Sequence, residues 1–257
     1  MVCPSACLER RGIRVQLQQD EILTPINDGL VLIEKKDGLT FGTDALLLAA
    51  FVRRQSRFTA ADFGSGTGVI SLLCAARNKF AHIHAIEIQP QYAALIGRNA
   101  AQNGLTDRIT PHCADVRDWN GGQLDAVFSN PPYMVKSGLA AKNEGRQIAR
   151  HEMHGTLADF CAAAGRVLRY GGLFYTVCRP DRTADLFCAM RQYGLEPKRT
   201  VWVYRDPDHA PALILTEAKK GARAALRVER PLFLYRDGQV SADYRYILEN
   251  GDFAEWK

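Results

Sequence analysis

The sequence predicts an α/β fold in which a mainly parallel sheet is covered by helices on both faces. Three observations lead to this prediction. From residue 58 onward, short β-rich runs alternate with helical patterns. A glycine-rich turn joins one of the expected strands to the next helix, and an Asn-Pro-Pro-Tyr sequence directly follows another strand. Strands that alternate with helices pair in parallel, and the connecting helices then cover both faces of the sheet.

The first 40 residues are expected to form an extension with a β-hairpin, ahead of a main domain that spans residues 41–257. Residues 14–40 are strand-like, with a β-rich run at Leu30–Ile33 and, at Asp37-Gly38, a dipeptide typical of hairpin turns. The rest of the chain contains no internal repeat and no long linker. A single main domain is therefore the simplest prediction.

A helix is expected over residues 44–54, with Asp44 as its N-terminal cap and the basic Arg53-Arg54 pair at its C-terminal end. After this helix, strand and helix patterns alternate. A later helix is expected to stop at Gly171-Gly172. The full set comprises strands over 58–63, 81–88, 108–115, 124–130 and 173–178, helices over 69–78, 90–103 and 156–169, and an antiparallel pair over 202–206 and 212–219.

The composition indicates a folded protein outside the membrane. Hydrophobic residues make up 47% of the chain and charged residues 24%, which does not indicate disorder. No apolar run approaches the roughly 18 residues of a membrane span, and the N-terminus lacks the apolar segment of a signal peptide. The seven cysteines include no Cys-x-x-Cys pair, which favours free thiols in a reducing compartment. We therefore expect a cytoplasmic protein that does not associate with membranes.

The glycine-rich turn predicts a binding site for a cofactor. Gly64, Gly66 and Gly68 follow an expected strand and open a helix, and they allow backbone amides to approach a ligand closely. A dinucleotide site is the alternative, but its fingerprint needs glycine or alanine where Val69 stands. The carboxylate of Asp62 would repel a pyrophosphate and favour the cationic end of S-adenosylmethionine. The turn therefore predicts that the chain binds S-adenosylmethionine.

Two further acidic residues are expected at the ends of the neighbouring strands. Glu87 ends the next strand, where a carboxylate can accept hydrogen bonds from both ribose hydroxyls. Asp115 follows the third strand and is expected to accept a hydrogen bond from an adenine amino group, with Asp118 as the alternative. Together with Asp62, these residues complete the expected cofactor site.

The sequence Asn130-Pro131-Pro132-Tyr133 predicts where chemistry takes place. It directly follows a strand, and ligands of open α/β sheets bind outside the carboxyl ends of the strands. The two prolines fix the backbone and donate no hydrogen bonds. The Asn130 side-chain oxygen and the Pro131 carbonyl are thus expected to accept hydrogen bonds from one planar amino group, while Tyr133 stacks on the substrate. Catalysis would consist mainly of alignment.

With these motifs in place, the chain resembles the class I methyltransferases, a Rossmann-like group, that act on amino nitrogens. It is similar to the tRNA1(Val) (adenine(37)-N6)-methyltransferase family over roughly residues 20–250. This resemblance implies a seven-stranded sheet with a late antiparallel strand, and it places Phe41, Gly42 and Thr43 near the cofactor. The segments that carry it are Asp62–Gly68, Glu87, Asn130–Tyr133, Phe41–Ala45, Ala149–Glu152, Glu217–Gly221 and Pro231–Tyr235.

The net charge of +5 permits an anionic partner such as RNA. Two basic runs are candidates for contacts with its phosphates, although a solvated surface is the alternative for each. Their members are Lys136, Lys142, Arg146 and Arg150 in the first run, and Lys219, Lys220, Arg223, Arg227 and Arg230 in the second.

No metal site is expected. His151 and His154 are three residues apart, whereas the zinc-protease motif needs histidines four apart on a helix. His82 and His84 share one face of a strand but lack a third ligand in the sequence pattern, which favours structural histidines.

The leading hypothesis is thus methyl transfer to N6 of an adenine in RNA, with tRNA as the expected partner. Three alternatives remain. They are methylation of a glutamine side chain in a release factor, methylation of an amino group in rRNA, and a binding module that has lost catalysis. A glutamine methyltransferase usually carries an N-terminal helical domain, whereas the N-terminal region here is short and strand-like. The sequence does not fix the oligomeric state.

Overall fold

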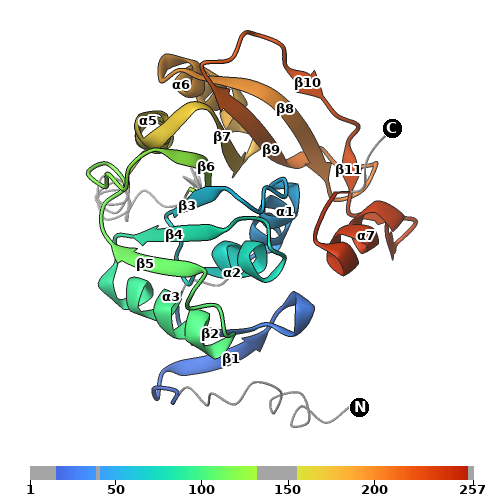
Figure 1. Ribbon diagram of the computed structural model, residues 1–257. Coiled ribbons are helices and arrows are strands. Elements are labelled where there is room, and N and C mark those ends of the chain that lie inside the picture. Colours follow the sequence, from blue (N-terminus) through green and yellow to red (C-terminus); the bar gives the residue numbers. More distant parts are fainter. Residues whose placement is uncertain (1–15, 39–40, 132–154, 254–257) are drawn as a thin grey trace, which may run out of the picture.

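The computed structural model describes residues 16–38, 41–131 and 155–253, and it has a central sheet between two layers of helices (Figure 1). The strands of this sheet are β3 (Thr59–Phe63), β4 (His82–Glu87), β5 (Ile109–Cys113), β6 (Leu124–Ser129), β7 (Leu168–Cys178), β8 (Leu195–Tyr204), β9 (Pro211–Lys220), β10 (Arg227–Val228) and β11 (Leu232–Phe233). Within the described part of the chain their order is β10-β8-β9-β7-β6-β3-β4-β5, and β11 also pairs with β8.

The seven longer strands, β3 to β9, form the predicted sheet. The strands from β5 across to β7 pair in parallel, and β9 lies antiparallel between β7 and β8. The prediction of a mainly parallel sheet with a late antiparallel strand is therefore confirmed. The short strands β10 and β11 extend it beyond β8.

Helices cover both faces of the sheet, as the sequence predicts. They are α1 (Thr43–Phe51), α2 (Val69–Ala76), α3 (Pro90–Gln102), α5 (Leu157–Val167), α6 (Thr183–Gln192) and α7 (Ala242–Asn250). Buried residues of α1, α2 and α7 form one core cluster together with Ile96 and Ala100 of α3, and those of α5 and α6 form another. Successive strand residues alternate between the two clusters, as Ala60 and Ala61 do in β3 and Val127 and Phe128 do in β6. The sheet is thus buried on both sides, and ligands have access at its edges and strand ends.

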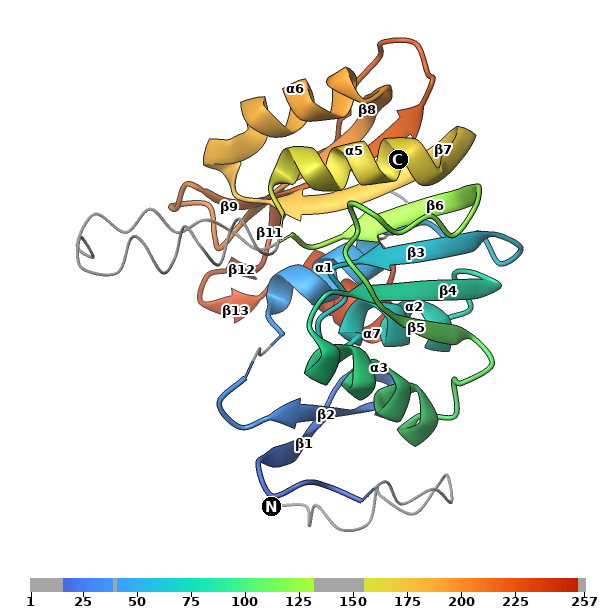
Figure 2. The same cartoon turned by 90° about the vertical axis from the view of Figure 1, so that its left-hand side faces the viewer.

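The expected N-terminal hairpin is present, but its turn lies elsewhere. The strands β1 (Glu21–Pro25) and β2 (Val31–Lys35) pair antiparallel, and the chain reverses at the short 3-10 helix η2 (Asn27–Gly29). Asp37-Gly38 instead follows β2. Both views show the hairpin beside α3 (Figures 1 and 2). There Asn99 of α3 accepts a hydrogen bond from the Ile33 backbone N–H at 2.6 Å and donates one to the Ile33 carbonyl at 3.2 Å.

Two local predictions are wrong. Gly42, in an extended conformation, is the N-terminal cap of α1, and Asp44 lies in the first turn of the helix. Gly171-Gly172 does not stop α5, because the chain already leaves the helix at Leu168 and enters β7 there. Leu168 pairs with Leu124 of β6, so this residue already belongs to the sheet, three positions before Gly171.

The helices α6 and α7 were not among the expected elements. The small hairpin of β12 (Tyr235–Arg236) and β13 (Gln239–Val240) precedes α7. Among the described residues, no helix is both long and apolar enough to cross a membrane.

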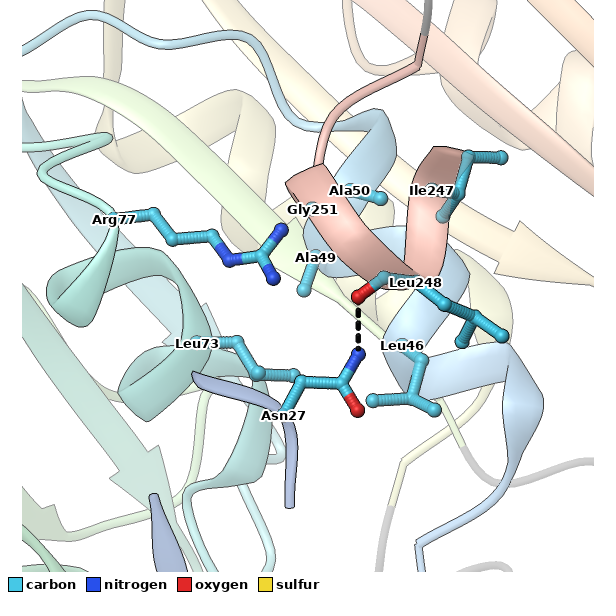
Figure 3. Close-up of a pocket in the computed structure, with 9 residues that line it drawn as sticks. All are labelled: Asn27, Leu46, Ala49, Ala50, Leu73, Arg77, Ile247, Leu248 and Gly251. Carbon is cyan, nitrogen blue, oxygen red and sulfur yellow. Dashed lines mark hydrogen bonds between the residues drawn. The ribbon is translucent and has the colours of Figure 1, made fainter. Parts of the chain in front are cut away.

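A pocket lies between the C-terminal parts of α1, α2 and α7 (Figure 3). The Asn27 side chain donates a hydrogen bond to the Leu248 carbonyl at 3.1 Å, and the Arg77 guanidinium points toward the end of α7. Because α2 starts at the glycine-rich turn and this pocket adjoins its last turn, the pocket is separate from the predicted cofactor site.

Candidate active site

The glycine-rich turn joins β3 to α2 and requires its glycines. Gly64, Gly66 and Gly68 have φ angles of +70°, +55° and +85°, in the left-handed region that favours glycine. A Cβ atom at Gly64 would lie 3.3 Å from the ring of Phe160, and one at Gly68 would lie 3.2 Å from Ile96. The turn is therefore tightly enclosed by the surrounding structure.

Asp62 lies under this turn, one residue before the end of β3, with 1% of its surface exposed. The Ser71 hydroxyl of α2 donates a hydrogen bond to its Oδ2 at 2.7 Å. The other oxygen, Oδ1, is buried and has no hydrogen-bond partner within the described residues. Burial raises the pKa of this carboxyl to about 7. The site thus contains a buried acceptor that a cationic donor would satisfy.

Glu87 connects the next strand to the same turn. It is the last residue of β4, and 5% of its surface is exposed. Its Oε2 accepts a hydrogen bond from the Gly66 backbone N–H at 3.0 Å, and its Oε1 accepts one from the Gln89 N–H at 2.9 Å. Each carboxylate oxygen has a further lone pair, so Glu87 retains capacity for additional donors. The predicted proximity of Glu87 to the glycines is therefore present.

Asp115 follows β5 and lies next to Glu87 along the sheet, since the Ala114 N–H donates to the Glu87 carbonyl at 3.0 Å. Its Oδ1 accepts hydrogen bonds from the Arg117 backbone N–H at 2.8 Å and from the Arg117 Nε at 3.0 Å. The hydrogen bond from Arg117 lowers the pKa of the Asp115 carboxyl. Asp115 is thus ionised and partnered by a cation. Its predicted contact with adenine stays a prediction.

Asn130 directly follows β6, which pairs with β3. The Ser129 hydroxyl donates to the Phe63 carbonyl at 2.8 Å, so the end of β6 is joined to the start of the glycine-rich turn. The Asn130 side-chain Nδ2 donates a hydrogen bond to Oδ2 of Asp44 at 2.9 Å. Pro131, the next residue, is buried. The predicted contribution of Tyr133 lies outside the described residues, as does the basic run at 136–150.

The start of α1 is joined to Asn130 by the hydrogen bond to Asp44. Phe41 packs against the core, Gly42 caps α1, and Thr43 is the first helical residue. Asp44 is a residue whose role the sequence analysis missed, because an acidic residue before an apolar run is usually a helix cap. The signal that pointed to it was its position within Phe41–Ala45. The structure thus brings Asp62 and Glu87 to the glycine-rich turn and joins Asp44 to Asn130, which follows the neighbouring strand.

Lys219 and Lys220 of the second basic run do not lie around this site. β9 is antiparallel to its neighbours, and its last residues, Lys219 and Lys220, pair with the first two residues of β8, Glu196 and Leu195. The Lys220 Nζ donates to the Leu168 carbonyl at 2.6 Å. Both lysines therefore lie at the amino ends of the parallel strands, whereas Asn130 lies at their carboxyl ends.

His82, His84 and His112 form a cluster of side chains on β4 and β5. His112 of β5 joins the pair on β4, with 3.0 Å between its Nε2 and Nδ1 of His84. His82 instead contacts the Thr110 hydroxyl at 2.9 Å. Desolvation lowers the pKa of His84 to about 4. Within the described ranges no group of three or more histidine, cysteine or acidic side chains is arranged to hold a metal ion. His151 and His154 lie outside those ranges.

The strand order, the glycine-rich turn after β3 and the acidic residue at the end of β4 define a class I methyltransferase. Solved structures of this fold superpose on the chain. A predicted O-methyltransferase from Agrobacterium tumefaciens gives a TM-score of 0.66 at 23% identity, covering 81% of this chain and 96% of that one. M. jannaschii TYW2 in complex with AdoMet gives 0.56 at 15% identity, covering 80% and 88%.

Sequence comparison identifies the family within this class. Residues 35–187 match the methyltransferase small domain family. A tRNA1(Val) (adenine(37)-N6)-methyltransferase from Porphyromonas gingivalis is 33% identical over 186 residues, which cover 68% of this chain and 72% of that protein. The protein of the same description from Phocaeicola vulgatus is 31% identical over 179 residues, covering 69% and 76%. The chain therefore belongs to the tRNA1(Val) (adenine(37)-N6)-methyltransferase family, and it is a methyltransferase.

Proposed function

We propose that this protein transfers a methyl group from S-adenosylmethionine to the exocyclic N6 of an adenine in tRNA. The observation that carries the proposal is the position of Asn130 beside the glycine-rich turn, at the carboxyl edge of the sheet. The curated relatives cited above are named for adenine N6 methylation in tRNA, which supports the choice of atom and of RNA. We further propose that the protein acts in the cytoplasm.

The residues around the glycine-rich turn fit S-adenosylmethionine. The unpartnered Oδ1 of Asp62 would accept from the amino group of the cofactor, which is a cationic donor. Glu87 would accept from the ribose hydroxyls and Asp115 from the adenine amino group, while the glycines Gly64, Gly66 and Gly68 admit the ligand close to the backbone. Phe41, Gly42 and Thr43 would border the same site. When bound, the cofactor supplies a methyl group activated by its sulfonium.

The Asn-Pro-Pro-Tyr sequence would hold the nitrogen that receives the methyl group. The Asn130 side-chain oxygen and the Pro131 carbonyl would accept the two amino hydrogens, and Tyr133 would stack on the base. Because both acceptors fix the amino group through its hydrogens, its lone pair stays available. The contribution of these residues is orientation, which by itself accelerates reactions strongly. A strong general base is not required for this arrangement.

The proposal is tested by offering the protein radiolabelled S-adenosylmethionine with separate pools of tRNA, rRNA and release factor. We expect label in tRNA and far less in the other two pools. Label in a glutamine of the release factor, or in rRNA alone, would show that this molecule, and not tRNA, is the substrate. The absence of transfer to all three pools by a protein that binds the cofactor would instead favour a binding module without catalysis.

A further inference from the structure

The side chain of Asn130 has two ends of the same shape and opposite chemistry. Its oxygen accepts hydrogen bonds, and its NH2 group donates them. A half-turn about the last side-chain bond exchanges the two ends. An amino group on a substrate needs the oxygen, because an NH2 group facing another NH2 group cannot make the required contacts. The orientation of this amide therefore decides whether Asn130 can receive an amino group at all.

The structure contains a side chain that sets this orientation. Oδ2 of Asp44 lies 2.9 Å from Nδ2 of Asn130, although the two residues are 86 positions apart in the chain. A carboxylate oxygen can only accept a hydrogen bond, so the NH2 end of Asn130 must face it. A hydrogen bond to a charged acceptor is about twice as strong as one between neutral groups. The contact thus directs the oxygen of Asn130 away from Asp44.

Asp44 is itself held in place. Its Oδ1 accepts a hydrogen bond from the Ala45 backbone N–H at 2.9 Å, and the positive end of the α1 dipole stabilises its charge. A Cβ atom on Gly42 would lie 2.7 Å from this same Oδ1. Only glycine at position 42 leaves room for the carboxylate where it is. This gives Gly42 a physical role in the placement of Asp44.

The two elements that carry these residues are rigid. Most of α1 is buried, including Leu47, Leu48 and Phe51, and four of the six residues of β6 have no exposed surface. The distance between the helix start and the strand end is therefore fixed by core packing. A fixed carboxylate on one element can hold the amide on the other in a single orientation.

We propose that Asp44 is a positioning residue that keeps the oxygen of Asn130 turned toward the substrate and so selects substrates that present an amino group. This inference rests on the proposed function for the identity of the substrate, but the orientation of the amide does not depend on it. Asp44 touches neither the substrate nor the cofactor in this account. It acts through Asn130.

The test uses Asp44→Asn, which preserves size but provides a side chain that can either donate or accept. We expect kcat to fall by about tenfold or more, as is common when a partner that orients a functional residue is lost. The affinity for S-adenosylmethionine should stay within about twofold of the parent's value. The midpoint temperature of thermal unfolding should stay within a few degrees of it. Asp243→Asn is the matched control, because Asp243 is also the second residue of its helix and forms an ion pair with Arg230 at 2.8 Å. It should leave kcat unchanged.

A double variant separates positioning from a general structural effect. In an Asn130→Ala background there is no amide to orient, so Asp44→Asn should cause no further loss in kcat. An equal loss in both backgrounds, or a large drop in cofactor affinity, would overturn the proposal.

A second readout needs no substrate. In 15N-labelled protein, Asp44→Asn should shift the side-chain NH2 resonances of Asn130 and leave those of Asn250 in place. Unmoved Asn130 resonances would refute the orientation itself. A clear shift combined with no methylation of tRNA by the parent would instead count against the proposed substrate alone.

Discussion

The carboxylate of Glu87 accepts a hydrogen bond from the backbone N–H of Gly66 at 3.0 Å, so the end of β4 and the glycine-rich turn after β3 form one unit. A residue that is expected to contact the ribose thus also supports the turn on which the rest of the cofactor would rest. Loss of this side chain therefore affects the site in two ways.

Glu87→Ala should weaken S-adenosylmethionine binding by at least about tenfold, because hydrogen bonds to charged groups contribute about 1.5–3 kcal/mol each. Isothermal titration calorimetry measures this directly. Glu249→Ala changes an exposed glutamate of α7 and should bind the cofactor as the parent does. NAD should bind neither protein. Tight NAD binding by the parent, or unchanged cofactor affinity in Glu87→Ala, would contradict the assignment of the turn.

The buried Asp62 predicts a distinctive dependence of stability on pH. Its pKa is raised by burial from 3.8 to about 7, so the folded protein favours the protonated form. The protonated Asp62 carboxyl therefore stabilises the folded state fully below about pH 4, and this stabilisation is lost as the pH rises to about 7. Relative to Asp62→Asn, the parent should lose about 1.4 kcal/mol per pH unit across that window, on the order of 4 kcal/mol in total.

Urea unfolding of the parent and of Asp62→Asn at several pH values measures this difference. The Asn variant should have nearly the parent's stability at pH 4 and should be the more stable protein at pH 8. A difference in unfolding free energy that stays constant with pH would show that Asp62 is ionised throughout.

Gly64→Ala should lower the free energy of unfolding by more than is usual when alanine replaces a glycine in the left-handed conformation. The backbone conformation alone accounts for about 1–2 kcal/mol, and the new methyl group would also press on Phe160 at 3.3 Å. Gly194→Ala is the matched control, because the φ angle of Gly194 is +73° and that of Gly64 is +70°. Apart from its chain neighbours, no heavy atom of the described residues lies within 4 Å of a Cβ atom placed on Gly194. Equal shifts in unfolding free energy for the two variants would mean that the Phe160 ring moves aside without cost.

Asn130→Ala should separate catalysis from cofactor binding. We expect kcat to fall by at least about a hundredfold, the scale on which loss of a positioning contact slows a reaction, with cofactor affinity nearly intact. Steady-state kinetics and calorimetry on the same protein provide both numbers. Asn250→Ala, on the exposed end of α7, serves as the control. Parallel losses in affinity and in kcat would assign Asn130 a structural role.

The order of the elements was predictable because each depends on local signals. Strands that alternate with helices, together with a glycine-rich turn, indicate a parallel sheet, and the segments from β3 to β5 and from β6 to β7 follow that pattern. The hairpin turn was misplaced because the first 40 residues contain the Asp-Gly dipeptide twice, at Asp28-Gly29 and at Asp37-Gly38, and the chain reverses at the first of them, in the short helix Asn27–Gly29. The decisive contact is tertiary, since the β2 backbone pairs with Asn99 of α3.

The candidate site was partly predictable for the same reason. Asp62, Glu87 and Asn130 each follow from their positions near strand ends, and the structure brings them together. Asp44 could not be assigned from its surroundings in the sequence, because its partner Asn130 is 86 residues away. The position of Lys219 and Lys220 does not follow from the basic run itself, because it depends on the direction of β9, which runs antiparallel to β7 and β8 and ends beside the start of β8.

The central claim is that this site methylates N6 of an adenine in tRNA, and the most direct measurement is the chemical identity of the methylated nucleoside. Unmodified tRNA is incubated with the protein and S-adenosylmethionine that carries a 13C methyl group, then digested to nucleosides and analysed by chromatography and mass spectrometry against standards. The account predicts 13C-labelled N6-methyladenosine. Label found only in another nucleoside, or on a ring nitrogen of adenine, would contradict it.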